Sequence, residues 1–163
     1  MEKKFELTAE CKIVLGVKLF RIRALKAIAK FSVKIGDLGG WIEKEGNLSQ
    51  YGNAWVYGDA RVYGNAEVYG NARVYGNALV CGDARICCKA DYMIFKNSWS
   101  SGRYCTYTRS NKMWRVGCFH GTGEKLIKKA YADSETSGKC YEAIVRAAEA
   151  IEAAKAEAKG EAK

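Results

Sequence analysis

Residues 96–115 combine positively charged and aromatic side chains, and no Asp or Glu interrupts them. Cations beside aromatic rings can clamp phosphates and stack bases, and arginine and aromatic residues also dominate protein-binding hot spots. A third interpretation is structural, with the rings covering the end of the preceding segment and the cations facing solvent. We assign partner binding to the residues with the most distinct chemistry, which are Trp99, Arg103, Tyr104, Arg109, Lys112 and Arg115.

The chain also has seven cysteines and a single histidine, His120. The odd number of cysteines and their unpaired spacings favour reduced thiols, as in a cytoplasm. A zinc site needs converging ligands, and the sequence has no C-x-x-C pair, so we expect no metal and no cofactor. The cysteines are Cys11, Cys81, Cys87, Cys88, Cys105, Cys118 and Cys140.

The basic aromatic stretch has the alternating pattern of a β-hairpin. A turn at residues 110–111 would place Tyr107 opposite Trp114 and Cys105 opposite Val116, which gives one consistent apolar face. This hairpin must be held by the segments on either side of it.

The segment after the hairpin has helical spacing of its apolar residues from residue 124 onward. A break is expected at 133–138. The tail over 153–163 is rich in Ala, Glu and Lys, which favours a helix without an apolar face, so we expect it to fray.

The segment before the hairpin, residues 46–93, repeats every six residues in hexads such as GNAWVY and GDARVY. Six is not a helical period, but it is an even number, so Ala and Val two apart point to the same face of a strand. Gly followed by Asn or Asp supplies a bend, because these residues tolerate positive φ. The pattern predicts short strands that bury Val56, Val62, Val68, Val74 and Val80.

These hexads resemble the hexapeptide-repeat family, which folds as a left-handed parallel β-helix. The resemblance implies a mainly β fold: a short solenoid of this kind with a β-rich N-terminal cap, a C-terminal hairpin and α-helices. It also implies that residues eighteen apart lie over each other, such as Asn53 over Asn71. The expected parts are cap strands at 1–45, the β-helix at 46–93, the aromatic and basic hairpin at 94–121, and helices at 122–163.

The repeats place a tyrosine at the end of most hexads, on the outside of the expected strands. Large exposed apolar surfaces usually mark an interface. We therefore expect a homodimer or homotrimer, with the alternative that the rings only brace the repeats. The oligomer surface would contain Tyr51, Tyr57, Tyr63, Tyr69 and Tyr75.

Glycine is also dense at 36–43, just before the first hexad. A phosphate-binding loop is one interpretation. The alternative is a tight lead-in turn, which we favour because no Lys-Ser/Thr follows.

Further motifs lie outside the hexads: LFRIRAL at 19–25, GDLGGWIE at 36–43, and WSSGR and WRVGCF within 99–124. With them, the chain is similar to small phage and prophage proteins of the hexapeptide-repeat or polymer-forming type. This resemblance implies a phage-encoded protein in a bacterial cytoplasm. By analogy, such proteins bind host proteins and can inhibit CRISPR or other defence systems.

The composition narrows the function classes. The 163 residues carry a formal net charge of +9, which suits an acidic partner. No apolar run is long enough to cross a bilayer, and no signal peptide is visible. We expect a non-enzymatic binding protein that engages a bacterial host protein. The alternatives are a nucleic-acid or nucleotide binder and an acyltransferase, which would need a histidine beside the repeats.

Overall fold

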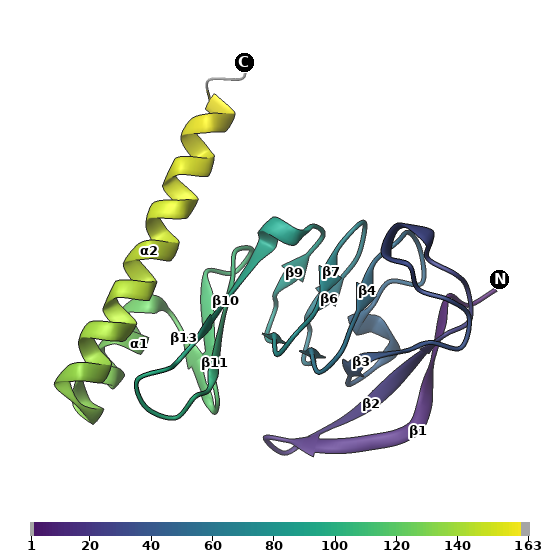
Figure 1. Ribbon diagram of the computed structural model, residues 1–163, viewed down its shortest axis with the longest axis horizontal. Coiled ribbons are helices and arrows are strands. Elements are labelled where there is room, and N and C mark those ends of the chain that lie inside the picture. The colour runs from purple at the N-terminus through teal and green to yellow at the C-terminus, as the bar shows by residue number, and fades with distance from the viewer. Residues whose placement is uncertain (1, 161–163) are drawn as a thin grey trace.

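The computed structural model describes residues 2–160 and shows a mixed β fold with two helices (Figure 1). A long N-terminal hairpin, β1 (Phe5–Val14) and β2 (Val17–Ala24), leads through β3 (Leu38–Ile42) into the repeats. The repeats contribute strands of only two residues each. These are β4 (Trp55–Val56), β5 (Arg61–Val62), β6 (Glu67–Val68), β7 (Arg73–Val74), β8 (Leu79–Val80) and β9 (Arg85–Ile86).

The repeat strands pair in parallel with partners eighteen residues away. Trp55 lies beside Arg73, and Val56 lies beside Val74; β5 with β8 and β6 with β9 follow the same spacing. The side-chain amide of Asn53 donates to Oδ1 of Asn71 at 2.8 Å. The expected eighteen-residue spacing is therefore confirmed. The predicted core is confirmed as well, since the five repeat valines are all fully buried.

The fold class that we expected, a left-handed parallel β-helix, is wrong. The strands form several small sheets, and antiparallel pairing joins β1 with β2, β2 with β3, and all four strands of a separate C-terminal sheet. Each repeat glycine from Gly52 to Gly82 has a positive φ, which interrupts the strand after two residues. The parallel ladders are therefore too short to dominate the fold, and the longer antiparallel strands on either side define it.

The N-terminal hairpin joins the repeats instead of only covering them. β3 pairs antiparallel with β2 and parallel with β5, which gives one five-stranded sheet in the order β1-β2-β3-β5-β8. Trp41 lies beside Arg61 in this sheet, and Ile42 lies beside Val62. The apolar interior is continuous from Phe5 to the repeat valines.

The C-terminal sheet comprises β10 (Tyr92–Lys96), β11 (Tyr104–Thr108), β12 (Met113–Val116) and β13 (Phe119–Gly121). The predicted hairpin register is confirmed, because Tyr107 lies opposite Trp114 and Cys105 opposite Val116. The sheet stands between the repeats and the helices (Figure 1).

Two helices cover the far face of this sheet: α1 (Gly123–Asp133) and α2 (Glu135–Gly160). Leu126 and Val145 pack against Trp114 in a second core. The predicted break is shorter than expected, since only Ser134 separates the helices. The tail that we expected to fray is helical up to Gly160, where α2 ends. Residues 161–163 lie outside the described part of the chain.

Among the lysines whose burial the structure describes, Lys4 alone is buried, and it leads to a pH prediction. Its ammonium donates to the backbone oxygens of Ala54 at 2.7 Å and Tyr51 at 3.5 Å. Burial lowers the pKa of Lys4 to about 8. The unfolded chain, with an ordinary lysine pKa, then binds more protons than the folded chain above that pH, so the free energy of unfolding should rise with pH.

Relative to Lys4→Met, the wild-type chain should therefore gain about 1–2 kcal/mol of stability between pH 7 and pH 9.5. Urea unfolding of both chains at the two pH values measures this. The Met variant removes the titrating group and keeps an unbranched side chain. Both chains contain the same tyrosines and cysteines, so the contribution of those groups cancels in the difference between the two free energies of unfolding. If the difference in the free energy of unfolding between the two chains were the same at pH 7 and pH 9.5, the lowered pKa of Lys4 would be contradicted.

Candidate functional site

The C-terminal sheet presents two different faces, and the predicted partner-binding residues divide between them. Cys105, Tyr107, Trp114 and Val116 point to the helices and are buried there. Alternate positions point to the repeats, where the Thr106 hydroxyl accepts a hydrogen bond from the backbone N–H of Leu79 at 2.9 Å. The sheet therefore covers the end of the repeats, as the structural interpretation of this stretch required.

Three of the predicted residues are engaged within the chain. Trp99 packs edge-on against Tyr141, with ring centroids 5.0 Å apart. Arg109 forms a 2.6 Å ion pair with Glu152 of α2. The guanidinium of Arg115 lies 5.7 Å from the ring centre of Tyr63, between the sheet and the repeats. The contacts of Trp99 and Arg109 tie the sheet to α2, and the contact of Arg115 lies where the sheet meets the repeats.

Lys112 is exposed in the turn between β11 and β12, at a φ of 55°. It lies away from the two remaining residues, Arg103 and Tyr104. The structure brings these two together with Arg61 and Leu15 around a hollow of about 300 Å³. We call this hollow the repeat-side groove; it is lined by Val14, Leu15, Arg61, Asn77, Leu79, Arg103, Tyr104 and Gly117.

The repeat-side groove is positively charged. The Nε of Arg61 is buried and has no hydrogen-bond partner in the structure. Burial, and then the charge of Arg61, lower the pKa of nearby Lys12, although Asp59 opposes this. The Lys12 ammonium lies 3.9 Å from the ring centre of Trp41. Positive charges this close repel one another, which raises the free energy of the unliganded groove. A bound anion would offset that repulsion, so the groove favours an anionic ligand.

An apolar tip borders the same groove. The turn between β1 and β2 is formed by Leu15 and Gly16, with φ values of 52° and 79°. A leucine at positive φ is an outlier, because its β-carbon crowds the backbone carbonyl oxygen in that conformation. Leu15 is 49% exposed, and neighbouring Ile13 is 76% exposed. The tip therefore displays apolar side chains at a conformational cost, next to Arg61 and Arg103.

Sequence reasoning missed Arg61, Asn77 and Leu15 as site residues. A signal for Arg61 was present, because the residue before the buried Val or Ile varies between hexads and is often charged, as in Arg61 and Glu67. Its pairing with Arg103 had no such signal. The two residues are brought together only by the contact between the C-terminal sheet and the repeats.

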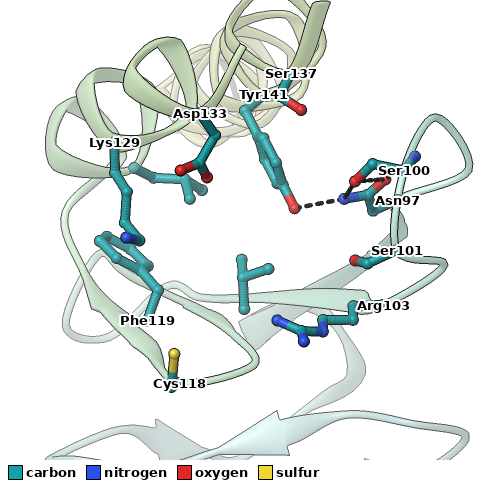
Figure 2. A pocket seen from close by; sticks show the side chains of 13 residues that line it. Asn97, Ser100, Ser101, Arg103, Cys118, Phe119, Lys129, Asp133, Ser137 and Tyr141 are labelled. Atoms are coloured by element: carbon teal, nitrogen blue, oxygen red, sulfur yellow. Dashed lines mark hydrogen bonds between the residues drawn. The ribbon is translucent and has the colours of Figure 1, made fainter.

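A second hollow lies on the helix side of the sheet, with a volume of about 230 Å³. Figure 2 shows Lys129 and Asp133 of α1 on one side, with Arg103 on the other. The side-chain amide of Asn97 donates to the Tyr141 hydroxyl at 2.8 Å, and burial raises the pKa of Tyr141 to about 12. Mixed charges line this pocket, so it favours anions less than the repeat-side groove does.

The predicted tyrosine surface is only partly present. Tyr63 is buried against Cys81, so it cannot belong to an exposed stripe. Tyr57 and Tyr75 are 46% and 50% exposed, and the Arg73 guanidinium lies 5.3 and 5.6 Å from their ring centres. Tyr69 is half-buried beside Arg85. The eighteen-residue spacing separates the tyrosines onto different faces, and self-association through them stays a prediction.

In the described part of the chain, no hydrogen bond joins His120 to a cysteine. The His120 ring lies against Gly82 of the repeats, and burial and the charge of Arg115 lower its pKa. All seven cysteines are free. Burial raises the pKa of Cys105 to about 11, so this thiol is inert at neutral pH.

No protein-family model matches the chain, and the search of curated proteins found no match. The resemblance to phage and prophage proteins, and the anti-defence role that it implies, therefore rest on the sequence motifs alone. Among the helices that the structure describes, none is both long enough and apolar enough to cross a membrane.

Proposed function

We propose that this chain is a non-enzymatic binding protein that engages an acidic segment of a second protein at the repeat-side groove. The observation that supports this most is the convergence of Arg61 and Arg103, neither of which forms an ion pair with a described side chain. Arg61 is half-buried, so its charge is costly without a carboxylate, whereas Arg103 is exposed and can reach a ligand from the rim. A carboxylate from outside would relieve the cost at Arg61 and pair with Arg103.

The groove favours a protein over a nucleic acid. Its cations stand beside apolar side chains, Val14, Leu15 and Leu79, which offer a nucleic acid neither hydrogen bonds nor stacking. Tyr104 and the exposed Leu15 would instead pack against apolar side chains next to the partner's carboxylates. A reducing cytoplasm suits the free cysteines, and a bacterial cytoplasm is the setting that we propose.

Charge reversal at Arg103 tests this function. The tagged chain would capture proteins from nuclease-treated bacterial lysate, and the captured protein would then be purified and titrated against each variant. We expect Arg103→Glu to weaken binding at least about tenfold, because the guanidinium is lost and a like charge replaces it. The affinity of Arg103→Gln should lie between those of the wild-type chain and Arg103→Glu, because this variant loses the guanidinium without adding a negative charge.

Lys112→Glu is the matched control, because it makes the same change of charge in the same hairpin, away from the groove. It should bind as tightly as the wild-type chain. Equal losses for Arg103→Glu and Lys112→Glu would show only a general charge effect and contradict the groove. Capture from untreated lysate that is lost from the nuclease-treated lysate would instead support nucleic-acid binding.

A further inference from the structure

Two adjacent thiols and a carboxylate converge at the end of the repeats, away from the repeat-side groove. Cys87 and Cys88 follow the last repeat strand, and a short 3-10 helix (Lys89–Asp91) turns the chain back toward them. One sulfur from each cysteine and one oxygen of Asp91 all lie within 4.8 Å of one another. Among the described residues, no other group of this kind was found.

The backbone holds the carboxylate in this place. The N–H groups of Cys87 and Cys88 donate to one oxygen of Asp91, Oδ2, at 2.7 and 2.9 Å. The other oxygen, Oδ1, lies 3.5 Å from the Cys88 sulfur, which donates to it. Fixing a ligand through its second oxygen is the usual way in which proteins orient a carboxylate toward a metal.

The three groups can be reached from solvent. Cys87 is exposed, and Cys88 and Asp91 are half-buried. Cys88 borders a surface hollow of about 480 Å³, which Lys30 and Lys89 also line. Two thiolates and a carboxylate around a divalent ion leave a net negative charge, which these lysines would offset. Water from the hollow could complete the coordination.

We propose that Cys87, Cys88 and Asp91 form a binding site for a thiophilic divalent cation such as Zn²⁺, with water as the fourth ligand. Two sulfurs and one oxygen suit zinc or cadmium, which prefer four ligands and accept thiolate, whereas magnesium and calcium prefer oxygen alone. Binding displaces the protons of both thiols to solvent as the metal–sulfur bonds form. The site is independent of the proposed partner-binding function.

The direct test uses Cd²⁺, because thiolate-bound cadmium has a charge-transfer absorption in the ultraviolet. Other reachable thiols are removed first, in a Cys11→Ser/Cys118→Ser/Cys140→Ser background that retains Cys87 and Cys88. We expect a single cadmium to bind and Zn²⁺ to displace it. Replacing Cys88 with Ser should lower the affinity at least about tenfold and remove part of the absorption.

Asp91→Asn distinguishes the role of the Asp91 carboxylate as a metal ligand from its role in holding the turn. The amide oxygen can still accept the two backbone hydrogen bonds, so the circular dichroism spectrum should be unchanged while cadmium affinity falls. The background chain with both Cys87 and Cys88 intact is the matched control. The proposal is overturned if that chain binds no cadmium, or if it binds no more tightly than the Cys88→Ser variant.

Discussion

Val74→Asp should unfold the repeat segment. Val74 is fully buried, and its nearest strand partner is another fully buried valine, Val56. A carboxylate at this position is cut off from solvent among apolar side chains, and burying an unpaired charge costs several kcal/mol. That cost is about the size of the whole stability of a small domain, roughly 5–15 kcal/mol.

Asn71→Asp is the control, because it adds the same charge in the same hexad at an exposed position. Its carboxylate can still accept the amide hydrogen bond from Asn53 that Asn71 accepts. Urea unfolding followed by circular dichroism should show a stable Asn71→Asp protein and a Val74→Asp protein that is unfolded or insoluble. A soluble Val74→Asp chain with native stability would refute the assigned core.

Gly39→Ala should cost about 3 kcal/mol or more of stability, because the strand β3 lies directly against its neighbours. A β-carbon at Gly39 would lie 2.5 Å from a side-chain carbon of Ile22 and 2.6 Å from the backbone oxygen of Val56. The backbone oxygen belongs to a repeat strand and cannot move without breaking its ladder. This glycine is therefore required by close packing.

Gly46→Ala is the matched control, since a β-carbon there would meet nothing within 4 Å and its φ is not positive. It should change stability by less than about 0.5 kcal/mol. Thermal unfolding of the two variants compares them directly. Similar losses in both would mean that the glycines act through chain flexibility. A larger loss of stability in Gly39→Ala than in Gly46→Ala would assign Gly39 a packing role. The alternative, a phosphate-binding loop, needs a loop between a strand and a helix, and Gly39 lies within the strand β3 instead.

Much of the local structure was predictable because it depends on neighbours in sequence. The hexads predicted the buried valines, and the alternation around residues 110–111 predicted the pairing of Tyr107 with Trp114. Both follow from the two-residue period of a strand, which any short window of sequence reveals. The fold class was not predicted correctly, because the strands at the two ends of the repeats pair antiparallel and outweigh the short parallel ladders.

The candidate site shows the same division. Composition alone indicated that Arg103 and Tyr104 belong to a basic aromatic surface, and the turn that brings Cys87 close to Asp91 spans only a few residues. Contacts between distant segments decided which arginines remain available to a partner. Arg109 is paired with Glu152 of α2, whereas Arg61 from the repeats faces the same groove as Arg103.

The physical reason is that a charged side chain is available only if the folded chain leaves it without a partner. Residue type and spacing determine where a side chain sits on its own strand. Whether a carboxylate, an aromatic ring or open solvent meets it there depends on segments tens of residues away, which only the packing of sheet, repeats and helices brings together.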